Sequence, residues 1–166
     1  MTSQIPTWLP PMVPVDGNLR LVVRALLSIF ELDFVTAQPR LENMPIWWDR
    51  RSAEFEGVTC CLGYKHLITR EDGDCIREFD PPRAARMPWC KPMFANGSDG
   101  DVRIWRHLEP PKRTMIYVWL EHHDYFALLE QRQQRVGVVA FLITAYHIDG
   151  ESVRRSLRQK WEDRLP

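Results

Sequence analysis

Four strand-like runs follow one another closely between residues 101 and 148, and they constrain the fold more than any other feature of the sequence. The runs are "DVRIWRHL", "RTMIYVWLEH", "YFALLEQ" and "GVVAFLITAYHI". They are rich in β-branched and aromatic residues, and short polar segments separate them. Because short connections join antiparallel neighbours, we predict a four-stranded antiparallel meander.

Helical patterns lie on both sides of these strands. Asp16 precedes "GNLRLVVRALLSIFEL", where apolar residues recur at helical spacing. In "FDPPRAARMPWC", Asp80 stands at a capping position, and a short helix should run from 81 to about 87 and end before Pro88. A stripe of Val153, Leu157 and Trp161 predicts a C-terminal helix. The class is α+β, with an N-terminal helical part packed on the four-stranded sheet, followed by the C-terminal helix.

Length and charge limit the possible organisation and partners. A chain of 166 residues fits one domain, which we place at 17–166, after a flexible proline-rich segment at 1–16. With 22 basic and 22 acidic residues, the chain offers nucleic acid or a membrane no global attraction. No signal peptide and no apolar run of about 18 residues is visible, so we expect a cytoplasmic protein with no membrane partner. The four cysteines lack metal-ligand spacing and read as buried free thiols, with no metal or cofactor.

The strand "GVVAFLITAYHI" ends in residues that can contact a phosphate. Alternation places Val139, Phe141, Ile143 and Ala145 on a core face and puts Thr144 and Tyr146 together on the other face, about 7 Å apart. His147 then points away from the two hydroxyls. By the same rule, Arg103, Trp105 and His107 share one face of "DVRIWRHL", which is either a platform for stacked bases or an exposed face on which Trp105 covers an apolar patch.

Cationic and titratable residues precede the meander. Arg83 and Arg86 are three apart, so on a helix they would share a face and hold an anion together, or else pair with Glu78 or Asp80. His66, in "GYKHLITR", lies among cations that favour its neutral, proton-accepting form. A loop histidine can equally be structural. The pair His122 and His123 lacks a third metal ligand and reads as part of a turn.

Four segments together resemble a family of small phage- and plasmid-associated bacterial proteins, across about residues 46–162. The segments are "RSAEFEGVTCCLGYKH", "REFDPPRAARMPWCKPMF", "RTMIYVWLEHHDYFALLEQR" and "FLITAYHIDGESVRRSLRQKW". The most specific parts are the run from Arg83 to Trp89 and the T-A-Y that ends the late strand. This family looks like a branch of the BECR-type nucleases, which group barnase, EndoU, colicin-type tRNases and RelE.

The resemblance implies a metal-independent endoribonuclease, toxin-like in action, that cleaves RNA by attack of the ribose 2′-hydroxyl. Its implied catalytic residues are His66 for proton transfer, Arg83 and Arg86 for charge stabilisation, and Thr144 and Tyr146 for phosphate contact. Further RNA contacts would come from Arg77, Arg103, Trp105 and Arg113. No cofactor is implied. The implied partners are RNA, with tRNA as one candidate, and a protein antitoxin or immunity partner.

The neutral charge departs from this family pattern, because many such ribonucleases are clearly basic. It is consistent with a narrow substrate, a substrate delivered by a partner, or a degenerate enzyme. The alternative is a non-catalytic phage or mobile-element protein that binds a protein or nucleic-acid partner. Seven tryptophans favour that alternative, since aromatic residues are common at interfaces.

Overall fold

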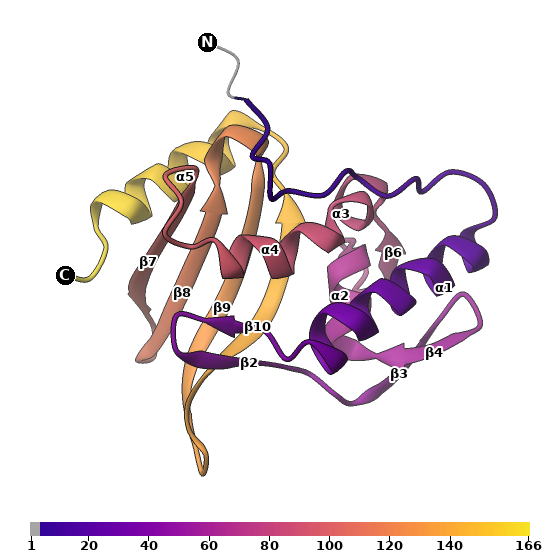
Figure 1. The fold of residues 1–166 in the computed structure, drawn as a ribbon, viewed down its shortest axis with the longest axis horizontal. Helices are drawn as coiled ribbons and strands as arrows, with labels where there is room; N and C mark the ends of the chain where they lie inside the picture. The colour runs from indigo at the N-terminus through magenta and orange to yellow at the C-terminus, as the bar shows by residue number, and fades with distance from the viewer. Residues whose placement is uncertain (1–3) are drawn as a thin grey trace.

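A six-stranded mixed sheet forms the centre of the computed structural model, which describes residues 4–166 (Figure 1). The strand order is β1-β2-β10-β9-β8-β7, and two small hairpins stand apart from this sheet. The sheet strands are β1 (Arg40–Leu41), β2 (Met44–Trp48), β7 (Val102–Glu109), β8 (Arg113–Leu120), β9 (Tyr125–Gln134) and β10 (Gly137–His147). The hairpins are β3 (Ser52–Phe55) with β4 (Val58–Cys61), and β5 (Thr69–Glu71) with β6 (Arg77–Phe79).

Five α-helices and three short helical turns accompany the strands. The α-helices are α1 (Leu19–Phe30), α2 (Leu62–Ile68), α3 (Pro81–Ala85), α4 (Cys90–Ala95) and α5 (Glu151–Glu162). The turns are the π-helix η1 (Glu31–Thr36) and the 3-10 helices η2 (Met87–Trp89) and η3 (Glu121–His123).

The α+β class and the antiparallel meander of β7 to β10 are confirmed, but the predicted sheet was too small. β2 extends it by pairing in parallel with β10, from Ala140 with Ile46 to Leu142 with Trp48. The apolar run "MPIWWD" forms β2, and its partner lies about 90 residues further along the chain. Periodicity reports the local conformation of such a run and carries no information about its partner.

The helix predictions hold, with shifted boundaries. The side chain of Asn18, rather than Asp16, caps α1 by accepting from the Leu21 N–H. Asp80 caps α3 by accepting from the Arg83 N–H, as its position predicted. The chain then turns through η2 into α4, a helix that the prolines in this segment concealed. Pro92 is tolerated in α4 because it lies in the first turn, where backbone N–H groups lack helical partners.

Both faces of the sheet are covered. Helix α4 contacts β8 on one face and α2 contacts β10, over a core that includes Ile116, Val118 and Leu129, and α1 adds its apolar side chains to the same core beside the sheet. On the other face, α5 covers an aromatic cluster by placing Leu157 over it, while Val153 and Trp161 pack at its margin. This cluster contains Trp105, Tyr117, Trp119 and Phe126. The predicted stripe of α5 therefore faces this second core.

The predicted base-stacking platform on β7 is wrong, because α5 covers it. Trp105 is only 3% exposed, stacks on Tyr117 with ring centroids 5.0 Å apart and meets the Trp161 ring edge-on at 5.4 Å. Arg103 pairs with Glu121 at 2.7 Å and lies over the Trp161 ring. The strand alternation was read correctly, but the partner of this face was assumed to be solvent when it is the C-terminal helix.

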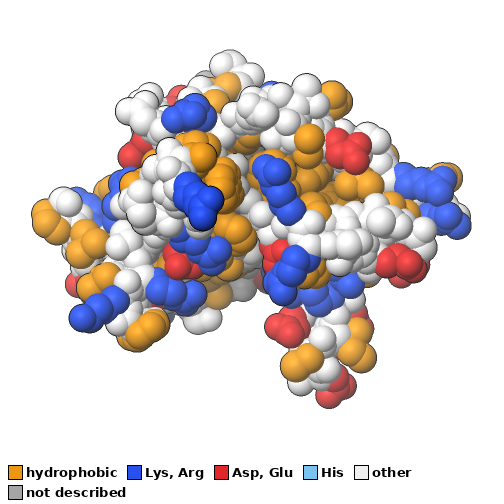
Figure 2. Space-filling view, turned by 90° about the horizontal axis from the view of Figure 1, so that it is seen from below, with side chains coloured by type: hydrophobic (Ala, Val, Ile, Leu, Met, Phe, Trp, Pro, Cys, Tyr) orange, Lys and Arg blue, Asp and Glu red, His pale blue; other side chains and the backbone are white. Residues whose placement is uncertain are grey.

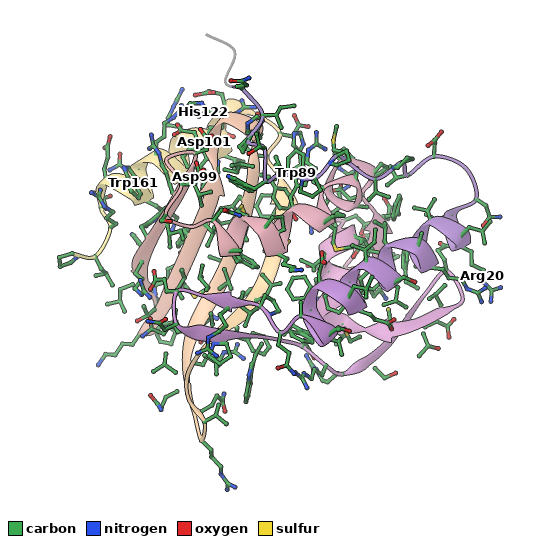
Figure 3. The ribbon with its side chains drawn as sticks, viewed as in Figure 1. Arg20, Trp89, Asp99, Asp101, His122 and Trp161 are labelled. Atoms are coloured by element: carbon green, nitrogen blue, oxygen red, sulfur yellow. The ribbon has the colours of Figure 1, made fainter. Side chains whose placement is uncertain are left out.

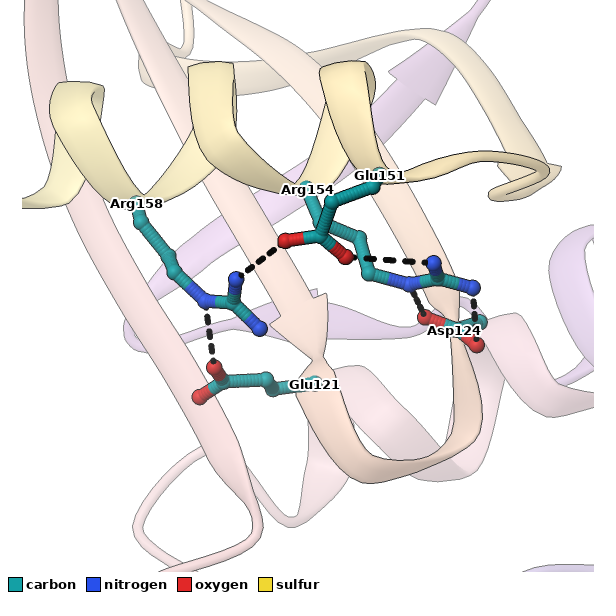
Figure 4. A network of polar contacts seen from close by, with 5 residues as sticks. All are labelled: Glu121, Asp124, Glu151, Arg154 and Arg158. Carbon is teal, nitrogen blue, oxygen red and sulfur yellow. Dashed lines mark hydrogen bonds and ion pairs between the residues drawn. The ribbon is translucent and has the colours of Figure 1, made fainter.

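A network of ion pairs ties α5 to the turn between β8 and β9 (Figure 4). Arg154 binds Asp124 through two nitrogens, at 2.7 and 2.9 Å. Arg158 reaches Glu121 at 3.3 Å and Glu151 at 2.9 Å. Bidentate guanidinium–carboxylate pairs fix orientation as well as distance, so this network sets the angle at which α5 crosses the aromatic cluster.

A β-bulge in β10 changes which side chains share a face. The pairing with β9 shifts between Leu142 and Thr144, so that Ile143 is the extra residue. Ala140, Leu142 and Ala145 face the first core, whereas Ile143 and Tyr146 pack against the second. The predicted core face of Val139, Phe141, Ile143 and Ala145 is therefore wrong, although Thr144 and Tyr146 do share a face because both follow the bulge.

The N-terminal segment was expected to be a flexible tail, but its described part is docked on the domain. The Trp8 indole N–H donates to the Asp99 carboxylate at 2.9 Å, and the Trp89 indole N–H donates to the Pro10 carbonyl at 2.8 Å. Figure 3 labels Trp89 and Asp99, which hold this segment from two different elements. Residues 1–3 lie outside the described part of the chain.

All four cysteines are free thiols, as predicted, but only Cys90 is buried. Cys60 and Cys61 are half-buried, and Cys75 is exposed in the turn between β5 and β6. Burial raises the pKa of the Cys90 thiol to about 12, so it behaves as an apolar group.

Gly63 fixes the approach of α2 to β2, and its replacement by Ala should destabilise the protein. A Cβ at this position would meet the Trp48 side chain at 3.0 Å and the Asp49 carbonyl at 3.1 Å. Overpacking of this kind costs about 1–3 kcal/mol, against a helix-propensity gain of about 1 kcal/mol. Urea unfolding should show a net loss for Gly63→Ala and none for Gly73→Ala, where no atom lies within 4 Å. Equal stability of the two variants would contradict this account of the contact.

Candidate anion-binding site

The candidate site forms where α2 and α3 pack against the second half of β10. β2 pairs with β10 only as far as Leu142, so the edge of the strand beyond this residue is not covered by another strand. The two helices occupy that position. They bring Arg83 of α3 to the Tyr146 ring of β10, and His66 of α2 to the Ile143 backbone of the same strand.

Arg83 is the residue that joins the three elements. Its Nη1 donates to the backbone carbonyls of His66 at 3.1 Å and Thr69 at 2.6 Å. Its guanidinium carbon lies 5.2 Å from the centroid of the Tyr146 ring, a cation–π contact. Its Nε faces the Asp80 carboxylate at 3.6 Å, which is too long for a hydrogen bond. Arg83 Nη2 makes no hydrogen bond to residues 4–166 and remains available to a ligand.

Arg77, from β6, brings a second guanidinium to the same point. Its Nε donates to the Thr69 hydroxyl at 2.8 Å and its Nη2 to the Thr69 carbonyl at 2.9 Å. Arg83 and Arg77 thus both donate to the Thr69 carbonyl oxygen. Thr69 itself is fully buried. Two like charges held this close repel each other, and an anion placed between them would relieve that repulsion. Burial also lowers the pKa of each of these two guanidinium groups, so both charged forms lack full hydration.

The environment of His66 favours a neutral imidazole. Its pKa is lowered first by burial, then by the charges of Arg77 and Arg83, while Asp49 and the Ile143 carbonyl act in the opposite direction. A neutral imidazole at neutral pH can accept a proton. Burial is thus the main cause that keeps His66 neutral, and the arginines that would bind an anion lower its pKa further.

Tyr146 supplies a hydroxyl beside Arg83. Burial raises the pKa of its phenol, and Arg83 offsets only part of this shift, so the group stays protonated and can donate a hydrogen bond. Its ring packs edge-on against Phe126 at 5.3 Å, which fixes its direction. Thr144 lies on the same face, two residues earlier, but the structure gives its hydroxyl no hydrogen bond to any described residue of the site.

Arg86 does not join this group, contrary to the prediction that it would share an anion with Arg83. It is the C-cap of α3, where the helix has ended, so the predicted helical spacing does not apply. Its Nη1 donates to the Pro82 carbonyl at 2.7 Å, and its guanidinium lies over the Trp89 ring at 5.5 Å. Arg86 neighbours His147, which lies on the opposite face of β10 from Tyr146. Burial and the Arg86 charge lower the pKa of His147.

The other predicted RNA contacts also lie elsewhere. Arg113 is the first residue of β8, and the end of β10 that carries Tyr146 and His147 lies level with the opposite end of β8, through the pairs Leu120–Tyr125 and Tyr125–His147. The Arg113 guanidinium faces the Glu130 carboxylate at 3.8 Å. Arg103 and Trp105 lie under α5, as described above. Of the predicted set, Arg83 therefore contacts both the His66 carbonyl and the Tyr146 ring, and Arg77 meets Arg83 at the Thr69 carbonyl. Thr144 lies two residues before Tyr146 on the same strand.

Thr69 is the residue that sequence reasoning missed. Its hydroxyl donates to the Lys65 carbonyl at 2.5 Å and accepts from Arg77, and its carbonyl receives both arginines. Thr69 is the one fully buried polar residue among those described. Nothing in "GYKHLITR" marks this role, because it depends on a strand and a helix that follow later in the chain.

The fold and site together define an α+β domain with a cationic, histidine-containing site at the edge of a mixed sheet. Comparisons of the chain with protein-family models, with curated proteins and with solved structures give no match. Across residues 4–166, no helix is long and apolar enough to cross a membrane. The same residues contain no group of three or more His, Cys, Asp and Glu side chains that could hold a metal ion.

Proposed function

We propose that this protein is a metal-independent endoribonuclease that acts on RNA in the cytoplasm, in the manner of a toxin. The observation that carries the proposal is the convergence of Arg77 and Arg83 on the Thr69 carbonyl, where Arg83 also bonds the His66 carbonyl and lies over the Tyr146 ring. Such a site fits a phosphodiester, because it combines two cations, a proton acceptor and a hydroxyl donor. A protein inhibitor of the antitoxin type would be its partner.

In the proposed reaction, neutral His66 takes the proton from a ribose 2′-hydroxyl. The 2′-oxygen attacks the adjacent phosphorus, and the bond from phosphorus to the 5′-oxygen breaks. The free nitrogen of Arg83, together with Arg77, would stabilise the charge that develops on the phosphate oxygens. Tyr146 would give its proton to the departing 5′-oxygen, and the proton held by His66 would return to the Tyr146 phenolate through water. The products are a 2′,3′-cyclic phosphate and a 5′-hydroxyl.

A second candidate function is binding without cleavage. It is favoured by one observation: Arg77 and Arg83 each use two donor contacts on the backbone or side chain of Thr69 and His66, as purely structural arginines also do. On this reading the site would hold a phosphate of a nucleic acid, or an acidic protein segment, without chemistry. Both candidates predict that loss of Arg83 weakens anion binding, and only the first predicts new RNA ends.

Total RNA incubated with the purified protein in EDTA should be cut, and Tyr146→Phe should slow the cleavage by about 10- to 100-fold, the value of one hydrogen bond to a charged group. Tyr117→Phe is the matched control, since its hydroxyl bonds Glu109 instead of the site. Circular dichroism should confirm that both variants are folded. Intact RNA after incubation with folded wild-type protein would rule out the nuclease. Only the binding function would then remain, whether or not the intact RNA is bound to the protein.

A further inference from the structure

A hollow of about 690 Å³ lies between η1, β1, β2 and β4, and Val136 of the β9–β10 turn also lines it. Its lining is largely apolar and includes Phe34, Ile46 and Trp48. Figure 2 views this underside of the molecule, where apolar side chains gather in the middle of the face with Lys and Arg side chains around them. The residues of the candidate anion-binding site do not line this hollow.

One wall of the hollow is the outer edge of β2, which is paired only from Met44 to the Ile46 N–H. β1 covers only Met44 and Pro45, and the Ile46 N–H donates to the Pro39 carbonyl at 3.1 Å. In a parallel ladder, alternate residues direct their N–H and C=O groups to opposite sides, so Trp48 shares the outward direction of Ile46. The Ile46 carbonyl and both backbone groups of Trp48 have no hydrogen bond to described residues on that side.

Unpaired strand edges beside apolar surface invite pairing with another chain, and natural proteins usually cover or charge them. Ile46 and Trp48 are buried residues that line the hollow, so their unpaired backbone groups can face only the hollow. These groups lie about 7 Å apart, two strand rises, which matches the repeat of a second strand. A small molecule would rarely satisfy a donor and two acceptors at that spacing. An extended peptide does so as a consequence of its backbone geometry.

The charges around the hollow select the kind of peptide. Two arginines line it, Arg40 and Arg50, and neither forms an ion pair with a carboxylate of residues 4–166. Arg50 lies over the Trp48 ring at 4.7 Å, so its guanidinium is held at the end of the open edge. Glu31 is the single acidic residue in the lining. An acidic side chain of an added strand would therefore find an unpaired cation next to the groups that pair its backbone.

We propose that the outer edge of β2 binds an extended segment of a partner protein by strand addition. The segment would pair its backbone with Ile46 and Trp48, insert an apolar side chain against Phe34, and place an Asp or Glu beside Arg50. Main-chain pairing supplies affinity in such complexes, and the side-chain pockets supply specificity. This interaction is independent of RNA cleavage.

The proposal is tested by selection from a phage-display library of random heptapeptides, which carries no RNA tag, against the full-length protein. Enriched peptides should carry Asp or Glu within an alternating apolar pattern and shift the amide resonances of Trp48 and Cys60. Two N-methylated versions of an enriched peptide are compared, one methylated at its odd residues and one at its even residues; both keep the side chains but lack half of the backbone donors. The version methylated on the side that faces β2 should not bind, and the other should bind. Arg50→Ala should weaken binding at least fivefold, whereas Arg155→Ala, an exposed arginine on α5, should not.

Three results would overturn the proposal. One is a selection that enriches no peptide shifting Trp48. Another is unchanged binding of both N-methylated versions of the peptide, which would mean that side chains alone occupy the hollow. The third is equal affinity for Arg50→Ala and Arg155→Ala. Because the readout is peptide binding, none of these outcomes depends on whether the protein cleaves RNA.

Discussion

His66→Ala is expected to lower the rate of RNA cleavage by about 10²- to 10⁴-fold, the usual contribution of a general base. The substitution keeps the backbone carbonyl to which Arg83 donates, so the arginines should stay in place. The wild-type rate should rise with pH on the acid side, because only the neutral imidazole accepts a proton. Since burial and the two arginines lower the pKa of His66, this rise should have its midpoint below the ordinary histidine value of about 6.5.

His122→Ala is the matched control for this prediction. His122 is exposed in η3 between β8 and β9, and its loss should change neither the rate nor its pH dependence. The measurement is a single-turnover cleavage rate between pH 5 and 8 for the wild type and both variants. A His66→Ala protein that is folded and retains the wild-type rate and pH profile would remove His66 from the mechanism.

Trp119→Ala should cost about 3–5 kcal/mol of unfolding free energy, the largest effect we expect on stability. Trp119 is fully buried in the cluster beneath α5 and meets Trp105 with ring centroids 6.4 Å apart. Its indole N–H has no hydrogen-bond partner among the described residues, so the loss arises from packing and from the cavity left behind. Guanidinium unfolding followed by circular dichroism measures it.

Trp161→Ala provides the comparison for this value. Trp161 lies at the margin of the same cluster, on α5, and is only half-buried. It should therefore lose clearly less stability than Trp119→Ala. If the two variants were equally stable, the aromatic cluster under α5 would not be a core, and the prediction of an open platform on β7 would regain support.

The sequence predicted those parts of the fold that depend on local pattern. The α1 helix, the Asp80-capped α3, the meander of β7 to β10 and the apolar stripe of α5 all follow from residues close together in the chain. Partners distant in the chain could not be predicted. The parallel pairing of β2 with β10 and the covering of Trp105 by α5 depend on contacts for which periodicity has no signal.

The site shows the same division. The structure brings the predicted residue Arg83 to the His66 carbonyl and to the Tyr146 ring, and Arg77 to the same Thr69 carbonyl, while the catalytic roles of these residues stay predictions. Arg86 failed because the helix ends at Ala85, and one bulge at Ile143 was enough to change the predicted core face of β10. Thr69 carries the convergence of both arginines through its carbonyl, a group that every residue possesses and that no sequence pattern distinguishes.

The most direct test of the central claim is the chemistry of the cleaved bond. An RNA oligonucleotide that the protein cuts is compared, in EDTA, with the same oligonucleotide carrying a single 2′-deoxyribose at the cleaved position. We predict a 2′,3′-cyclic phosphate and a 5′-hydroxyl from the first substrate and no cleavage at that position of the second. Cleavage of the deoxy-substituted bond, or products with a 5′-phosphate, would contradict attack by the 2′-hydroxyl and with it the role proposed for His66, Arg83 and Tyr146.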